Sequence, residues 1–193
     1  ASKLNASLNK ASSKLKAFGK SATKIGKDLS IKLTAPIVFA GGAAIKMASD
    51  FEETESKFNT VFSSIQNQAQ QTAKTFKESF GLSSLAAKDM LSSTGDLLVG
   101  FGFAEQEALN LSNQVNSLAV DLASFTNFSG GAKGASEALT KALLGETESV
   151  KSLGIAITQA DLTSFAAEQG LVFKELDRVA RANLIFQLAL KQS

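Results

Sequence analysis

The chain has 193 residues, enough for one ordinary hydrophobic core or for several smaller helical packets. It contains no Cys, His, Trp or Tyr, so disulfides, Cys or His metal sites and catalysis by a Ser–His–Asp or Cys–His arrangement are excluded, and we expect no enzyme, no cofactor and no metal. The net charge is +2, but it is unevenly distributed. Residues 1–34 carry eight Lys and one acidic residue, Asp28, whereas the rest of the chain carries 12 basic and 17 acidic residues. This asymmetry indicates a solvated helix face or, as alternatives, weak contact with nucleic acid or a membrane.

Residues 1–34 are the first predicted segment, a basic helix with a narrow apolar seam. Because the chain begins at Ala1 and not at Met, we interpret it as a piece of a longer protein. The apolar positions alternate between steps of four and three residues and are Leu4, Leu8, Ala11, Leu15, Phe18, Ala22, Ile25 and Leu29. Such heptads are typical of coiled coils, in which identical chains bury the seam together. The candidate oligomer interface is therefore Leu4, Leu8, Leu15, Phe18, Ile25 and Leu29, and the alternative is a lone amphipathic helix on a membrane.

Residues 35–80 are the second predicted segment, which starts with Pro36 in the first turn of a new helix. About 13 residues around this point carry no charge, and the run includes the apolar residues Ile37, Val38, Phe39 and Ile45. A bilayer span needs about 20 residues. The run therefore predicts a closely packed small-residue helix or, as the alternative, a membrane-active segment. Apolar residues recur every seven positions as far as Ile65, which predicts one helix from about Pro36 to Ser79, with weak points at 41–42 (GG) and 66–68 (QNQ).

Residues 81–193 are the third predicted segment, a packet of shorter helices. The expected helices cover about 85–99, 104–127, 135–144, 146–153, 158–170 and 174–191. Glycines follow several of them, as is common after a helix end, and Thr158 with Asp161 resembles a capping box. No run shows sustained strand alternation. The predicted fold class is all-α, with long helices, an N-terminal coiled-coil segment and a packet of shorter helices after it.

Two groups of residues could indicate binding chemistry, and each has a structural explanation. An acidic cluster could attract a cation and consists of Asp50, Glu52, Glu53 and Glu55. Adjacent helical positions diverge, however, and hard cations need several converging oxygens. Glycine-rich stretches at 100–102 and 130–134 follow no predicted strand and lack the spacing of a phosphate loop, so we interpret them as helix breaks.

The two arginines of the chain, Arg178 and Arg181, lie one turn apart on the last predicted helix. Asp177 and Glu175 are their nearest acidic neighbours in the sequence. We therefore expect the arginines to pair with these carboxylates or to contact a neighbouring subunit.

Several short blocks of sequence carry a family resemblance. In chain order they are 33–36 (LTAP), 48–52 (ASDFE), 118–125 (LAVDLASF), 137–139 (EAL), 144–146 (LGE), 151–158 (KSLGIAIT) and the C-terminal stretch 181–193. In this order and spacing, residues 33–193 resemble the core region of phage tail tape measure proteins, and residues 1–32 fit a generic coiled-coil flank. Phe103 departs from the family, whose members commonly have a polar helix cap at this position.

The resemblance implies a structural protein that sets the length of a phage or phage-like tail tube during assembly and leaves the lumen at genome ejection. It implies a homo-oligomer, a trimer, in contact with the tail tube protein, with tail tip or baseplate hub proteins, with assembly chaperones and, at ejection, with the host envelope membrane. The implied location is the interior of the tail in the virion, and the host cytoplasm during assembly. No specific nucleic acid is implied. The alternative function is a membrane-inserting or pore-forming helical protein that acts at envelope penetration.

Overall fold

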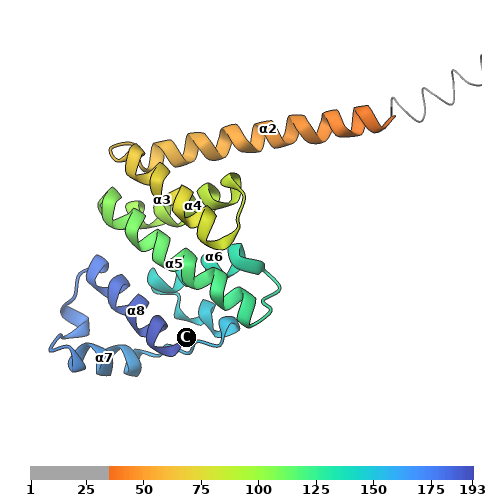
Figure 1. Ribbon diagram of the computed structural model, residues 1–193. Helices are drawn as coiled ribbons and strands as arrows, with labels where there is room; N and C mark the ends of the chain where they lie inside the picture. The colour runs from red at the N-terminus through yellow and green to blue at the C-terminus, as the bar shows by residue number, and fades with distance from the viewer. Residues whose placement is uncertain (1–34) are drawn as a thin grey trace, which may run out of the picture. The chain divides into compact units, whose positions relative to one another are not determined.

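The computed structural model describes the backbone of residues 35–193, and the side chains of Lys46 and of residues 48–193 (Figure 1). Within this part of the chain every regular element is a helix, which confirms the all-α class. The predicted coiled coil of residues 1–34 lies outside the described residues. Internal contacts divide the chain between Asp50 and Phe51, and the hydrophobic core clusters lie in the unit Phe51–Ser193.

The helices follow one another with short connections. In chain order they are α2 (Ala35–Val61), α3 (Gln66–Phe80), α4 (Ser84–Phe101), α5 (Glu105–Phe125), α6 (Gly131–Leu143), the 3₁₀-helix η2 (Thr147–Leu153), α7 (Gln159–Glu168), the 3₁₀-helix η3 (Phe173–Glu175) and α8 (Arg178–Gln192). The prediction of one helix from Pro36 to Ser79 is wrong, because the chain turns between α2 and α3.

The turn between α2 and α3 is held by contacts that the local sequence does not show. Phe62 is fully buried and meets Phe58 edge to face, with ring centroids 5.3 Å apart. The two serines after Phe62 bond to the carboxylate of Glu105 at the start of α5: Ser64 donates from its amide at 2.9 Å and from its hydroxyl at 2.8 Å, and the Ser63 hydroxyl donates at 3.2 Å. Hydrogen bonds to Glu105, about 40 residues further along the chain, therefore override the heptad pattern that predicted a continuous helix.

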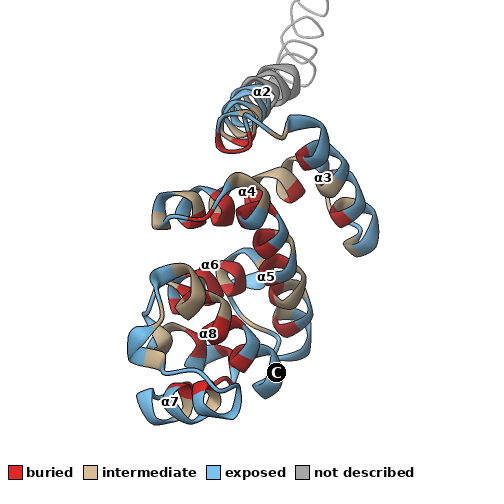
Figure 2. Cartoon of the chain, turned by 90° about the vertical axis from the view of Figure 1, so that its left-hand side faces the viewer, coloured by how far each residue is buried: buried red, intermediate tan, exposed pale blue. Residues whose placement is uncertain are grey.

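Two clusters of buried side chains form the core, and α5 contributes to both. The first joins the end of α2 to α3 and α4 and includes Phe58, Phe62, Phe76 and Leu91, with Leu109 of α5. The second joins α5, α6, η2, α7 and α8 and includes Val115, Leu139, Leu143, Leu153, Leu162 and Phe186. Helix α5 packs mainly against α4 and α6. Figure 2 shows the buried positions gathered where α4, α5, α6 and α8 face one another.

The starts of α4, α7 and α8 have side-chain caps, whereas those of α3, α5 and α6 have none. The Ser83 hydroxyl accepts a hydrogen bond from the Ala86 amide at the start of α4, and the predicted capping box of Thr158 and Asp161 is confirmed at the start of α7. Two of the helices predicted in the C-terminal part of the chain differ from the observed ones. The helix expected at 146–153 is a 3₁₀-helix, and the helix expected at 174–191 is split, because the Asp177 carboxylate caps a new start of α8 at the Ala180 amide.

Candidate functional site

The candidate sites proposed from the N-terminal sequence fall outside the described side chains. The candidate oligomer interface of Leu4, Leu8, Leu15, Phe18, Ile25 and Leu29 lies in the residues that the structure does not describe. The proposed membrane-active residues Ile37, Val38, Phe39 and Ile45 fall within helix α2, and their side chains lie outside the described set. Among the described residues no helix combines the length and the apolar character needed to cross a membrane.

The acidic cluster on α2 is divided between solvent and an ion pair. Asp50, Glu52 and Glu53 are exposed, whereas Glu55 pairs with Lys88 of α4. The Lys88 ammonium also lies 5.4 Å from the centroid of the Phe58 ring. In the part of the chain that the structure describes, no three acidic side chains gather closely enough to hold a metal ion. Glu55 therefore ties the end of α2 to α4.

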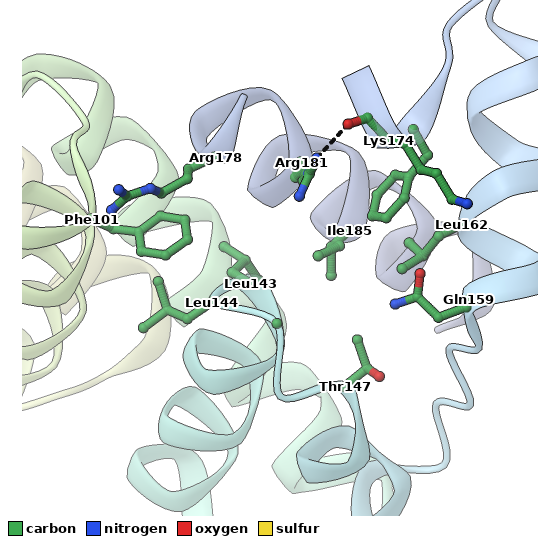
Figure 3. A pocket seen from close by; sticks show the side chains of 12 residues that line it. Phe101, Leu143, Leu144, Thr147, Gln159, Leu162, Lys174, Arg178, Arg181 and Ile185 are labelled. Carbon is green, nitrogen blue, oxygen red and sulfur yellow. Dashed lines mark hydrogen bonds between the residues drawn. The ribbon is translucent and has the colours of Figure 1, made fainter. Parts of the chain in front are cut away.

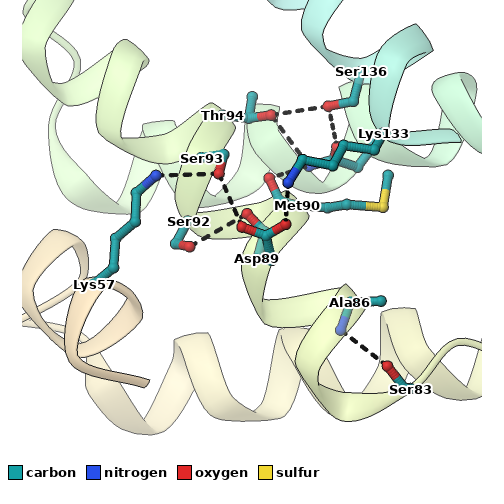
Figure 4. Close-up of polar contacts among 11 residues, drawn as sticks. Lys57, Ser83, Ala86, Asp89, Met90, Ser92, Ser93, Thr94, Lys133 and Ser136 are labelled. Atoms are coloured by element: carbon teal, nitrogen blue, oxygen red, sulfur yellow. Dashed lines mark hydrogen bonds and ion pairs between the residues drawn. The ribbon is translucent and has the colours of Figure 1, made fainter. Parts of the chain in front are cut away.

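A network of polar side chains crosses α4 and α6 near the surface (Figure 4). The Asp89 carboxylate on α4 accepts from the Lys133 ammonium of α6 at 2.8 Å and from the Ser93 hydroxyl at 3.4 Å, and Ser93 in turn accepts from Lys57 of α2 at 3.1 Å. The hydrogen bond from Lys133 to Asp89 raises the pKa of the lysine. The network connects three helices through one carboxylate.

A second group of polar side chains, here called the polar cluster, is buried between α4, α5 and α6 and consists of Thr94, Asn116, Ser136 and Thr140. The Thr94 hydroxyl lies 3.1 Å from that of Ser136, and Ser136 donates to the Asn116 side-chain oxygen. The Asn116 amide donates to the Met90 carbonyl at 3.1 Å, and Thr140 lies 3.3 Å from Thr94. The sequence patterns did not indicate this cluster, although the four-residue spacing of the small polar residues Ser136 and Thr140 on an apolar helix face was a usable signal.

A pocket of about 310 Å³ opens beside the N-terminal half of α8 and is here called the arginine pocket. Its walls come from the ends of α4 and α6, from η2 and α7, and from η3 and α8, through Phe101, Leu143, Leu144, Gly145, Thr147, Gln159, Leu162, Phe173, Lys174, Arg178, Arg181 and Ile185. Figure 3 shows Lys174, Arg178 and Arg181 along one side of the pocket, with Thr147 opposite.

The expected pairing of the two arginines with Asp177 or Glu175 is wrong. Asp177 caps α8, and neither arginine forms an ion pair with a described residue. The Arg178 guanidinium lies 6.0 Å from the centroid of the Phe101 ring, and that of Arg181 lies 5.6 Å from the Phe173 ring. Arg181 also donates to the Lys174 carbonyl at 2.6 Å. Each guanidinium therefore lies near an aromatic ring, only that of Arg181 also bonds to a backbone carbonyl, and neither forms an ion pair with a described carboxylate.

The sequence blocks that carry the family resemblance meet in one part of the fold. Block 118–125 is the second half of α5, block 137–139 lies in α6, and blocks 144–146 and 151–158 connect α6 through η2 to α7. Helix α6 packs against both α5 and η2, and Val150, Leu153, Ile155 and Ile157 are buried around this junction.

No protein-family model, no curated protein and no solved structure matches the chain.

Proposed function

We propose that this chain is a segment of the tape measure protein of a phage or phage-like tail, a non-enzymatic helical protein that sets the length of the tail tube. The observation that carries the proposal is the ordered set of sequence blocks between residues 33 and 193. Further support comes from the all-helical architecture of the described residues and from the packing of four of these blocks around the junction of α5, α6 and η2.

In this proposal the seam of residues 4–29 is shared between copies of the chain. Its apolar residues keep the coiled-coil spacing over nearly four heptads, and a seam this narrow is best buried against identical seams. Three copies then form a rod, the tail tube protein polymerises around the rod with the help of assembly chaperones, and hub proteins at the tail tip hold one end. The protein lies inside the tail of the virion and leaves ahead of the DNA at genome ejection.

The proposal makes length in residues proportional to length in space, and in-frame deletion tests it. Removing about four heptads from the seam region of the parent protein should shorten the tails by roughly 40 Å, because an α-helix rises 1.5 Å per residue. Tail length is measured by electron microscopy of purified particles.

The matched control replaces the deleted residues with an unrelated heptad sequence of equal length. If the chain acts as a ruler, this replacement restores the original tail length, since length and not local chemistry is read. Tails of unchanged length after the deletion contradict the proposal, as do tails that stay short after the replacement.

A further inference from the structure

From its charge and shape we infer that the arginine pocket is a docking site for an acidic peptide segment, in which a carboxylate lies next to an apolar side chain. This inference goes beyond the proposed ruler function and does not depend on it. Its partner is a segment of another protein chain.

The electrostatics of the pocket favour an anionic partner. Three lining residues, Lys174, Arg178 and Arg181, are cationic, and no lining residue is acidic. None of the three forms an ion pair within the described part of the chain. Arginine forks bind carboxylates with two parallel hydrogen bonds, and such charge-assisted bonds are among the stronger polar contacts in proteins. The wall of the pocket thus carries three cationic side chains and no acidic one.

One of the two arginines is positioned before any partner arrives. The Arg181 guanidinium lies over the Phe173 ring and donates to the Lys174 carbonyl, whereas Arg178 is exposed near the Phe101 ring. The Arg181 Nε atom is buried and has no acceptor among the described residues. Buried donors are normally satisfied, so this nitrogen is an unmet polar group at the wall of the pocket. Preorganised side chains also lose less entropy on binding.

The apolar part of the pocket favours a peptide over a simple anion. Leu143, Leu144 and Ile185 supply aliphatic wall, and the loop before Phe173 exposes Leu171 and Val172, which are 41% and 56% accessible. A volume of about 310 Å³ lies at the small end of ligand sites. It suits one large apolar side chain with its neighbouring carboxylate, while the Gln159 amide and the Thr147 hydroxyl can bond to a peptide backbone.

The charge outside the pocket disfavours a nucleic acid. The chain after residue 34 carries 12 basic and 17 acidic residues, so its net charge is negative and provides no extended field for a polyanion. The Phe101 and Phe173 rings, on which bases could stack, already lie under arginines. A short acidic segment needs only the local cluster of cations.

Fluorescence anisotropy with the full chain tests the inference. The probes are labelled hexapeptides that place Asp or Glu beside Leu, Ile or Phe, each with a counterpart that has Asn or Gln instead of the acid. We expect acidic members to bind at least about ten-fold more tightly than their amide counterparts, because charge-assisted hydrogen bonds are lost in the amides. An equal affinity of every pair overturns the inference.

Variants assign the binding to the pocket. Arg178→Ala and Arg181→Ala should each weaken the acidic peptides about ten-fold. Lys191→Ala is the matched control and should leave the affinity unchanged. Lys191 lies on the same helix and over a phenylalanine ring, but it does not line the pocket. Thermal melting monitors folding, and Leu144→Gln gives a second test that keeps both arginines. If Arg178→Ala, Arg181→Ala and Leu144→Gln all bind the peptides like the wild type, the site lies elsewhere and the inference fails.

Competition distinguishes the other occupants. Inorganic phosphate or a single-stranded oligonucleotide that binds to the pocket as tightly as the best peptide overturns the choice of a peptide. Self-association of the chain that disappears in Arg178→Ala and Arg181→Ala identifies a second copy as the occupant and also overturns it. Because tail length is measured independently, failure here leaves the ruler proposal untouched, and the reverse also holds.

Discussion

Glu105 illustrates how a single side chain can end a helix to which it does not belong. It is the first residue of α5, and its carboxylate accepts three hydrogen bonds from Ser63 and Ser64 in the turn after α2. The amide of Ser64 is the main cause of a lowered pKa of this carboxyl group, and the hydroxyl of Ser64 is the next. The charged form of Glu105 is therefore the one that stabilises the turn.

The lowered pKa of Glu105 makes the stability of the turn depend on pH. In a group whose folded pKa lies below the unfolded value, the stabilisation is present above the ordinary pKa of 4.5 and is lost as the pH falls through the folded pKa. We expect Glu105→Gln to lower the free energy of unfolding by roughly 0.5–1 kcal/mol near neutral pH, because the bonds are partly exposed. Below the folded pKa the difference should vanish.

Urea unfolding at several pH values measures this difference between the wild type and Glu105→Gln. Glu107→Gln serves as the control, since Glu107 is exposed on the same helical turn and bonds to neither serine. A difference for Glu105→Gln that stays constant down to acidic pH would contradict the assigned role.

Close approach of helices is the dominant feature at the scale of elements. Gly95 of α4 faces the end of α2, and a Cβ atom at this position would lie 2.4 Å from Cζ of Phe62 and 3.2 Å from Cγ1 of Val61. The polar cluster uses the same principle, because short Ser and Thr side chains let α4 and α6 approach while their hydroxyls bond to each other. Satisfied buried polar groups also restrict how the helices can align.

Gly95→Ala should destabilise the chain. Phe62 is fully buried and cannot swing away without disturbing the first core cluster, so overpacking of about 1–3 kcal/mol outweighs the gain in helix propensity of up to about 1 kcal/mol. The control is Gly100→Ala on the same helix, where a Cβ meets nothing within 4 Å. There we expect unchanged or slightly raised stability in urea unfolding. Equal gains in both variants would show that α4 does not pack on Phe62 as described.

Association between copies is a property of the whole molecule, and the seam of residues 4–29 predicts it. We expect the chain to sediment as an oligomer and Leu15→Glu to convert it to a monomer, because a charge buried in a coiled-coil core is left without a partner. Lys16→Glu is the matched control, since Lys16 is adjacent but lies off the seam and should leave the oligomer intact. A wild-type chain that stays monomeric at high concentration would remove the basis of the shared rod.

Sharing of α5 between the two core clusters is the other feature of the whole molecule. Leu109 packs in the first cluster, whereas Leu111 and Val115 pack in the second, so successive faces of one helix serve both. The sequence predicted a helix at about 104–127, yet it could not show which elements each face of the helix would cover. That assignment depends on the path of the whole chain.

Sequence alone determined the helical class and most helix ends, because periodicity, capping residues such as Ser83 and Thr158, and glycines after helices act within a few residues of each other. The shared seam of residues 4–29 stays a prediction. Only the tertiary structure decided the break after Val61, the polar cluster and the arginine pocket. The physical reason is the same in each case, because the contacts join residues that are distant in the sequence, as Ser64 and Glu105 are. A local sequence pattern does not specify which distant residue a side chain will contact.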